Sequence, residues 1–275
     1  MTAVTVNARA APPPDAPRGA PMPLEILITG GTGQLGRDCA AVLAGAGRVQ
    51  ALGRRDLDIA DAAQVQRVIE DLQPAVIVNC AAYTAVDACE SRPEDAWRVN
   101  ALAPGVLARA AARRGSLLVH YSTDYVFDGR RPAPRPYTEA DPPGPCSVYG
   151  RSKLAGEEAV RQAGGAHLIL RTAWLYGRHG RNFLKTILTR ALADPARPLR
   201  VVDDQWGSPT WSRRLAEQTR VLIEHGARGT FHATAEGHGT WFDLATAFLH
   251  AMGVPHRVDP CPTRDYPTPA TRPAN

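Results

Sequence analysis

The sequence predicts an α/β fold in which a Rossmann-like, doubly wound parallel sheet carries a smaller C-terminal lobe. Short apolar runs alternate with segments of helical spacing from Leu24 to Thr172. The first of these runs leads directly into a glycine-rich turn, Gly30 to Gly36. Strands that alternate with helices form parallel sheets, and right-handed crossovers place the helices on both faces.

Each expected strand is a short apolar run, and each expected helix has apolar residues three and four positions apart. In chain order, the first elements are a strand over 24–29, a helix over 38–46, a strand over 49–52, a helix over 62–72, a strand over 75–80, a helix over 97–114 and a strand over 117–122. A proline-rich surface loop (130–145) separates them from a helix over 148–162 and a strand over 167–172.

Beyond Thr172 the pattern is less regular. Helical spacing occurs over 182–193, 213–224 and 242–252, and extended segments are expected over 200–202 and 229–233. Some of these later elements are expected to return to the main sheet.

The composition excludes several functional classes. The 275 residues are 44% hydrophobic and carry a formal net charge of +5. Lys and Arg are scattered among Asp and Glu, so nucleic-acid binding is not expected. No apolar run is long enough for a membrane span and no secretory signal is present, so we expect a cytoplasmic protein. The five cysteines lack C-x-x-C spacing and no H-E-x-x-H occurs, so no disulfide framework and no metal are expected.

The glycine-rich turn lies between a predicted strand and a predicted helix, the context in which such motifs bind dinucleotides. Gly30 allows the tight turn, Gly33 allows the backbone to approach a pyrophosphate, and Gly36 allows close packing of the helix. The helix N-terminus then faces the phosphates. The spacing is G-x-x-G-x-x-G, and an ordinary strand–helix turn is the alternative.

The end of the second strand bears on cofactor choice. An acidic residue there binds the ribose hydroxyl of NAD, whereas this chain has Arg54 and Arg55. A guanidinium can bind a 2′-phosphate through paired hydrogen bonds, which favours NADPH, with NADH also possible. The alternative is that both arginines are solvated loop charges.

Tyr149 and Lys153 are four residues apart on a predicted helix and therefore share one face. A cation beside a tyrosine is expected to lower its pKa toward the range of a proton relay. Upstream, the segment Ser122 to Phe127 lies at the carboxyl end of a predicted strand, where ligands of doubly wound folds bind. A hydroxyl there can hydrogen-bond a substrate carbonyl.

Taken together, these motifs resemble the extended short-chain dehydrogenase/reductases, and more narrowly the dTDP-4-dehydrorhamnose reductase family. The resemblance runs from about Leu24 to Asn275. The segments that carry it are 30–36, 57–59, 78–87, 120–127, 149–157, 171–177, 204–210, 266–269 and 272–273. It implies reduction of the 4-keto group of dTDP-4-dehydro-L-rhamnose with NADPH or NADH, the final step of dTDP-L-rhamnose synthesis.

The resemblance also implies roles for individual residues. Tyr149 donates the proton, Lys153 orients the cofactor ribose and tunes Tyr149, and Thr123 binds the keto oxygen. Asp124 and Trp174 contact the sugar nucleotide. The residues implied in cofactor binding are Gly30, Thr32, Gly33, Gln34, Leu35, Gly36, Arg54, Asp58, Ile59, Ala81, Ala82, Tyr83, Thr84, Tyr149 and Lys153.

Two of these interpretations have alternatives. Trp174 could be a core aromatic at a strand end. Asn100 could support a proton relay, as in related enzymes, or could be a turn or helix-cap residue.

The expected organisation is a disordered Pro/Ala-rich tail (1–21), an NAD(P)-binding Rossmann domain (22–172) and a mainly substrate-binding lobe (173–275) that is partly interleaved with the Rossmann sheet. The family usually continues past its Arg-Pro motif, so a C-terminal truncation is expected. Some members form dimers around a divalent metal. Asp38 is the one candidate ligand and the others are not evident, so a metal is not expected. The resemblance also allows a homodimer.

Two alternatives remain for function. One is reduction or epimerisation of another nucleotide-linked keto sugar on the same scaffold. The other is a non-catalytic NADP-binding regulatory subunit, against which the intact Thr123, Tyr149 and Lys153 argue.

Overall fold

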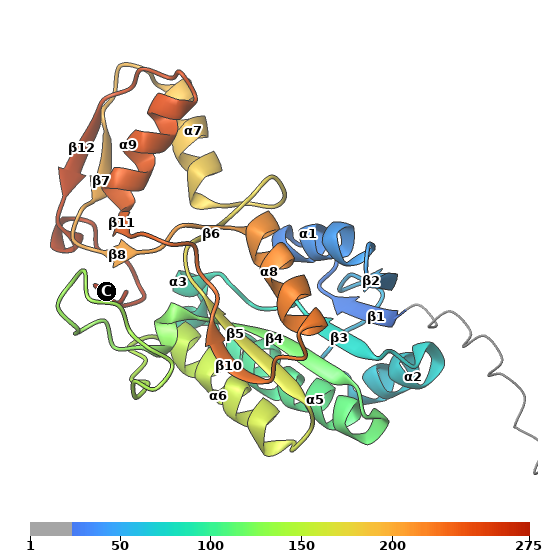
Figure 1. The fold of residues 1–275 in the computed structure, drawn as a ribbon. Helices are drawn as coiled ribbons and strands as arrows, with labels where there is room; N and C mark the ends of the chain where they lie inside the picture. The colour runs from blue at the N-terminus through green and yellow to red at the C-terminus, as the bar shows by residue number, and fades with distance from the viewer. Residues whose placement is uncertain (1–23) are drawn as a thin grey trace, which may run out of the picture.

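The computed structural model describes residues 24–275, so the tail expected over 1–21 lies outside the described residues. Within them, six strands form a sheet in the order β10-β5-β4-β3-β1-β2, and every pair in it is parallel (Figure 1). The strands are β1 (Leu24–Thr29), β2 (Gly47–Leu52), β3 (Val76–Asn79), β4 (Leu117–Thr123), β5 (His167–Thr172) and β10 (Gly229–His232). This topology confirms the predicted doubly wound α/β fold.

Helices cover both faces of the sheet (Figure 1). They are α1 (Gln34–Leu43) and α8 (Ser212–Glu224) on one face, and α2 (Ala62–Leu72), α5 (Ala103–Arg114) and α6 (Val148–Gln162) on the other. Successive strand residues point to opposite faces. Ile26 and Ile28 therefore pack in a buried cluster with Leu215 of α8, whereas Leu27 packs in a second cluster with Leu107 of α5.

The single helix expected over 97–114 is interrupted. The chain instead forms α3 (Val86–Ser91), α4 (Pro93–Trp97), a π-helical turn η1 (Arg98–Leu102) and then α5. Such turns are rare and often lie at functional sites. Here the turn contains the buried Asn100.

The C-terminal half divides between the sheet and a lobe. The segments α8 and β10 return to the main sheet, while α7 (Phe183–Ala193), α9 (Trp241–Ala251), β7 (Leu199–Val202) and β12 (Val258–Cys261) form the lobe around their own small core. Figure 1 shows this lobe standing apart from the sheet and its helices. Short pairs, β6 (Leu175–Tyr176) with β9 (Thr210–Trp211) and β8 (Trp206–Gly207) with β11 (Gly239–Thr240), occur in the connecting segments.

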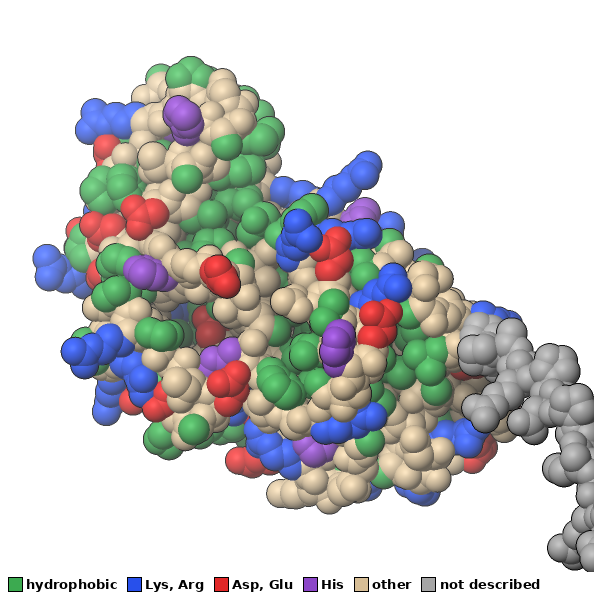
Figure 2. All heavy atoms as spheres, in the orientation of Figure 1, with side chains coloured by type: hydrophobic (Ala, Val, Ile, Leu, Met, Phe, Trp, Pro, Cys, Tyr) green, Lys and Arg blue, Asp and Glu red, His purple; other side chains and the backbone are tan. Residues whose placement is uncertain are grey.

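The surface in Figure 2 carries basic and acidic side chains interspersed with one another. In the part of the chain that the structure describes, no helix has the length and apolar character needed to cross a membrane.

Candidate active site

A cavity of about 850 Å³ lies between the carboxyl ends of the sheet strands and the C-terminal lobe. Strand ends, the start of α1 and the start of α6 supply one wall, and residues of α7 and α9 supply another. The predicted site residues that line it are Gly33, Gln34, Leu35, Ala82, Thr84, Thr123, Asp124, Tyr149, Lys153 and Trp174. Residues spread over more than a hundred positions of sequence therefore meet in one space.

The glycine turn brings the chain close to its neighbours. Gly30 has φ +65°, and a Cβ there would lie 2.7 Å from the backbone nitrogen of Ala81. A Cβ on Gly36 would overlap the carbonyl of Gly30. Gly33 precedes α1, and no side chain caps that helix. The first N–H groups of α1 are thus left for a ligand, and the turn fits a bound pyrophosphate.

The residues expected at the adenosine end lie beyond β2 and do not line the cavity. The Asp58 carboxylate accepts hydrogen bonds from the Ala60 N–H and from Arg98, both at 3.0 Å, and these bonds lower its pKa. Ile59 is buried. Arg54 is exposed and forms no ion pair with any residue of 24–275.

Thr32 lies between the glycine turn and the end of β2. A Cβ on Gly53 would lie 2.9 Å from its methyl carbon. The segment expected to bind the pyrophosphate and the segment expected to bind the adenosine ribose are therefore in contact.

The catalytic candidates come from β4 and α6. Thr123 ends β4, and its hydroxyl donates a 2.9 Å hydrogen bond to Asp124. Tyr149 and Lys153 lie in the first turns of α6, whose start is capped by Ser147. Burial raises the pKa of Asp124 to about 6, which brings its titration close to neutral pH.

The lowered pKa expected for Tyr149 beside Lys153 is not found in this structure. Burial raises the pKa of Tyr149 above its ordinary value of 10.0, and a hydrogen bond with Thr123 only partly opposes this shift. The ammonium of Lys153 instead donates to the carbonyl of Tyr121 at 2.6 Å. Burial also lowers the pKa of Lys153 to about 8. Tyr149 is consequently a protonated phenol at neutral pH.

Asn100 holds the loop beside the cavity. Its side-chain oxygen accepts from the Tyr83 N–H at 2.8 Å, and its amide nitrogen donates to the Tyr83 carbonyl at 3.0 Å and to Ser152 at 3.1 Å. The amide thus joins the loop that contains Ala82 and Thr84 to α6. The side chain of Asn100 therefore has a structural role, and its part in a proton relay stays a prediction.

Trp174 lies at the cavity in an uncommon conformation, with φ +45°. Its ring stacks on Trp241 with 3.6 Å between centroids and 8° between planes. Trp241 could not be identified from the sequence, because the start of α9 carries only the ordinary apolar pattern of a helix.

A second contact missed from sequence is the ion pair between Arg272 and Asp87 at 2.9 Å, both of which line the cavity. The Arg-Pro motif gave a signal for Arg272, but nothing in the sequence indicates its partner.

Metal ligation receives no support from the described residues. Among residues 24–275 there is no group of three or more His, Cys, Asp or Glu side chains placed to hold an ion. Asp38 is buried, and its carboxylate accepts a 2.5 Å hydrogen bond from Ser212. All five cysteines are free thiols.

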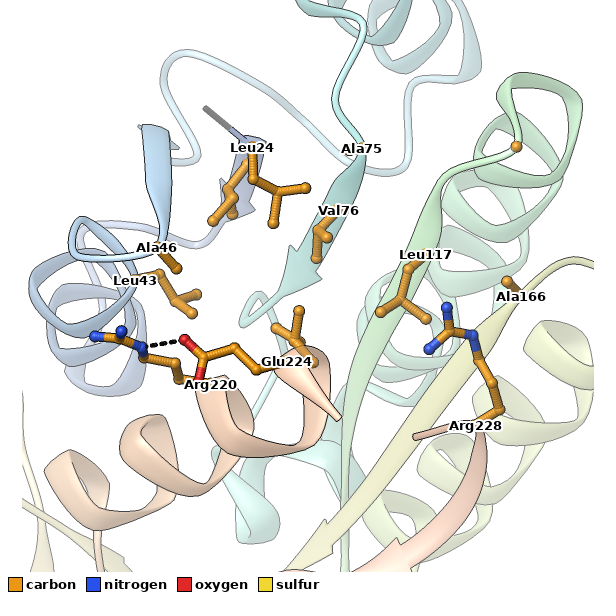
Figure 3. A pocket seen from close by; sticks show the side chains of 13 residues that line it. Leu24, Leu43, Ala46, Ala75, Val76, Leu117, Ala166, Arg220, Glu224 and Arg228 are labelled. Atoms are coloured by element: carbon orange, nitrogen blue, oxygen red, sulfur yellow. Dashed lines mark hydrogen bonds and ion pairs between the residues drawn. The ribbon is translucent and has the colours of Figure 1, made fainter. Parts of the chain in front are cut away.

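A smaller cavity of about 360 Å³ lies at the opposite, amino ends of the strands. In Figure 3, Leu24, Val76 and Leu117 point into it from the sheet, and Arg220 pairs with Glu224 at its edge. None of the predicted site residues lines it, so the larger cavity is the candidate active site.

Comparison with known proteins gives consistent results. The family model described as the RmlD substrate binding domain matches residues 24–275. A dTDP-4-dehydrorhamnose reductase from Burkholderia thailandensis is 43% identical over 269 residues, covering 92% of this chain and 89% of the relative. A dTDP-4-keto-6-deoxy-D-glucose reductase from Streptomyces niveus is 45% identical over 240 residues, covering 86% and 82%. The solved dTDP-4-dehydrorhamnose reductase of Bacillus anthracis in complex with NADP has a TM-score of 0.88 and 36% identity, covering 92% of this chain and 89% of that one.

Proposed function

The chain belongs to the family of the RmlD substrate binding domain, and from that premise we propose that it is a dTDP-4-dehydrorhamnose reductase. It reduces the 4-keto group of dTDP-4-dehydro-L-rhamnose with NADPH, or less favourably NADH, to give dTDP-L-rhamnose. The observation that carries the proposal is the meeting of Thr123, Tyr149 and Lys153 in the cavity that the uncapped start of α1 also enters.

The residues present fit a dinucleotide. Gly33, Gln34 and Leu35 offer backbone N–H groups to the pyrophosphate, and Ala82 and Thr84 border the nicotinamide side of the cavity. Arg54 is free to bind the 2′-phosphate of NADPH. When bound, the cofactor supplies the hydride.

Tyr149 supplies the proton. A raised pKa keeps its phenol protonated at neutral pH, which is the state that a proton donor to the sugar oxygen requires. Loss of that proton leaves a phenolate. Lys153, one turn further along α6, supplies a cation on the same helix face, which opposes the cost of burying this phenolate without outweighing it. Thr123 donates a hydrogen bond to the keto oxygen and orients the carbonyl.

The sugar side of the cavity is formed by Asp124 and Trp174. Asp124 offers a carboxylate that can accept hydrogen bonds from sugar hydroxyls, while the indole of Trp174 offers apolar area to the sugar ring. These roles, like those of the cofactor residues, are part of the proposal.

The test is NADPH oxidation by the purified chain with dTDP-4-dehydro-L-rhamnose generated in situ. Tyr149→Phe is expected to lower kcat by a factor of about 10² to 10⁴, because the proton donor is lost. Tyr137→Phe is the control, since Tyr137 lies in a surface loop bonded to Asp128. Tight NADPH binding without turnover by the wild type would favour a regulatory subunit instead.

A second candidate is a reductase of another nucleotide-linked keto sugar. The similarity to the Streptomyces niveus dTDP-4-keto-6-deoxy-D-glucose reductase supports this second candidate. A panel of dTDP-linked and UDP-linked keto sugars distinguishes the two through kcat/KM. Formation of an epimer without net NADPH oxidation would indicate an epimerase.

A further inference from the structure

Three aromatic rings meet at the lobe side of the cavity, where Trp174 stacks on Trp241 and Phe183 is tilted against Trp241. Trp241 lies between Trp174, at 3.6 Å between centroids, and Phe183, at 4.5 Å. All three line the cavity. Trp174 follows the end of β5 in the main sheet, whereas Phe183 begins α7 and Trp241 begins α9. This aromatic cluster therefore connects the sheet side of the cavity to two helices of the lobe.

The surroundings of Trp174 hold it in an unfavourable backbone conformation. A φ of +45° is uncommon for a residue with a large side chain and persists only where neighbouring structure enforces it. The Thr210 N–H donates to the Trp174 carbonyl at 3.3 Å. Gly207 packs so closely that a Cβ there would overlap the indole.

Trp241 is itself fixed in place. It is the first residue of α9, and the helix begins with a capping box in which Thr240 and Asp243 exchange hydrogen bonds of 2.8 and 3.0 Å. Gly239 and Thr240 also pair with Gly207 and Trp206. Gly207 presses on the indole of Trp174, and Trp241 stacks on it. The pairing of β8 with β11, which leads directly into α9, joins these two residues.

We propose that Trp241 is a positioning residue for sugar-nucleotide binding, which acts by holding the indole of Trp174 at the cavity wall. The inference rests on the proposed function, because it assigns a residue that sets the sugar side of that site. Trp241 need not contact the substrate. Its removal frees Trp174 to leave the strained conformation, and the sugar then loses an ordered apolar surface.

The experiment compares Trp241→Leu, Trp241→Phe and Trp211→Leu in the full chain. Trp211 is exposed and does not line the cavity, so its replacement controls for the loss of an indole. Far-ultraviolet circular dichroism reports the stack directly, because two stacked indoles give an exciton couplet that isolated ones do not. The kinetic readouts are kcat and KM for dTDP-4-dehydro-L-rhamnose, together with NADPH affinity.

We expect Trp241→Leu to lose the couplet and to raise KM for the sugar nucleotide about tenfold, while kcat and NADPH affinity stay unchanged. Trp241→Phe keeps a stacking ring and is expected to restore most of the KM. Gly207→Ala, which pushes on the same indole without changing Trp241, is expected to raise KM in the same way.

An unchanged KM in Trp241→Leu, with the wild type active, overturns the inference and leaves the proposed function standing. The inference is also overturned if Trp241→Leu raises KM and loses NADPH affinity together, and Trp241→Phe does not restore KM. General unfolding then explains the effect. If the wild type is inactive, the proposed function fails first. Titration with dTDP-L-rhamnose then tests the inference through the dissociation constants of the wild type and of Trp241→Leu. Equal dissociation constants, or no binding by the wild type, overturn the inference as well.

Discussion

The ammonium of Lys153 donates a 2.6 Å hydrogen bond to the carbonyl oxygen of Tyr121, its partner on β4. Lys153 is only 2% exposed, and a buried cation with one acceptor is costly to keep charged. Burial accordingly lowers its pKa to about 8. The charge that stabilises the Tyr149 phenolate in the proposed reaction is therefore present at neutral pH and lost in mild alkali.

The first prediction concerns the alkaline side of the pH profile. We expect kcat/KM for NADPH, which reports the enzyme without cofactor, to fall as pH rises through about 8. The Lys153→Met variant should be slow at every pH and should lack this limb. An alkaline limb that is unchanged in Lys153→Met would show that another group titrates.

Lys153 also gives a prediction for stability. Its folded pKa is about 8 and its ordinary value is 10.5, so between these pH values the unfolded chain binds more protons. The free energy of unfolding of the wild type should gain a contribution of up to roughly 3 kcal/mol as pH rises across this window. Urea denaturation at several pH values checks this, and Lys153→Met should lack the contribution.

Asp124 gives the matching prediction on the acid side. Burial raises its folded pKa from 3.8 to about 6, so the native state binds more protons across that interval and stability falls as pH rises through it. Asp124→Asn should exceed the wild type in stability by roughly 1–3 kcal/mol at pH 7, and the difference should vanish near pH 4.

Asp128→Asn is the control for Asp124. The hydrogen bond from Tyr137 holds the pKa of Asp128 below its ordinary value, so this variant should lose stability at pH 7. If Asp124→Asn and Asp128→Asn changed the stability equally in thermal denaturation at pH 7, the raised pKa of Asp124 would be contradicted.

Much of the framework could be predicted from local sequence. Apolar runs located the central strands because parallel strands such as β3 and β4 are buried on both faces. The helix expected over 148–162 has those bounds, so the four-residue spacing of Tyr149 and Lys153 does place both at the cavity.

What local sequence could not provide depends on tertiary contacts. Trp241 meets Trp174 only because the fold brings the start of α9 beside the segment that follows β5, far away in sequence. The raised pKa of Tyr149 arises from burial by segments distant in sequence, whereas the spacing to Lys153 alone indicated the opposite shift. The π-helical turn at Asn100 has no periodicity that distinguishes it from the neighbouring helices.

Glu157 supplies a prediction about the support of α6. Its carboxylate, fully buried, accepts from Arg171 at 2.9 and 2.8 Å and from Arg161 at 2.6 Å. Burial raises the pKa of Glu157, but these arginines and Ser122 outweigh it and lower the pKa overall. Glu157→Gln leaves the buried Arg171 without its charge partner, so the free energy of unfolding should fall by about 3–5 kcal/mol.

The exposed neighbour Glu158 provides the control for that measurement, since Glu158→Gln should change stability by no more than about 0.5 kcal/mol. The stability that the Glu157 carboxylate contributes should be present above pH 4.5 and be lost as pH falls through its lowered folded pKa. Similar losses for both glutamine variants in urea denaturation would contradict the prediction.

Arg54 is predicted to set cofactor preference. It is exposed beyond β2 and forms no ion pair with other residues of 24–275, so its guanidinium is available to a 2′-phosphate. Arg54→Ala should lower the ratio of kcat/KM for NADPH over NADH by about tenfold or more, whereas Arg55→Ala should change it little. A wild-type ratio at or below unity would refute the preference itself.

The last prediction concerns the closing segment of the chain. Arg272 donates to both oxygens of Asp87, at 3.0 and 2.9 Å, and so ties the C-terminal segment to the first turn of α3. Both residues line the cavity, and the same arginine also bonds the carbonyl of Ala270. Arg272→Met should release the segment and raise KM for the sugar nucleotide several-fold without changing NADPH affinity.

Because Asp87 is partly exposed, the pair itself should contribute only about 1 kcal/mol to stability. A double-mutant cycle with Asp87→Asn and Arg272→Met separates this contact from the other bonds of each residue. If the two residues act through their ion pair, the effects of the two substitutions on KM should be less than additive. Full additivity would mean that the two residues act independently and would contradict the prediction.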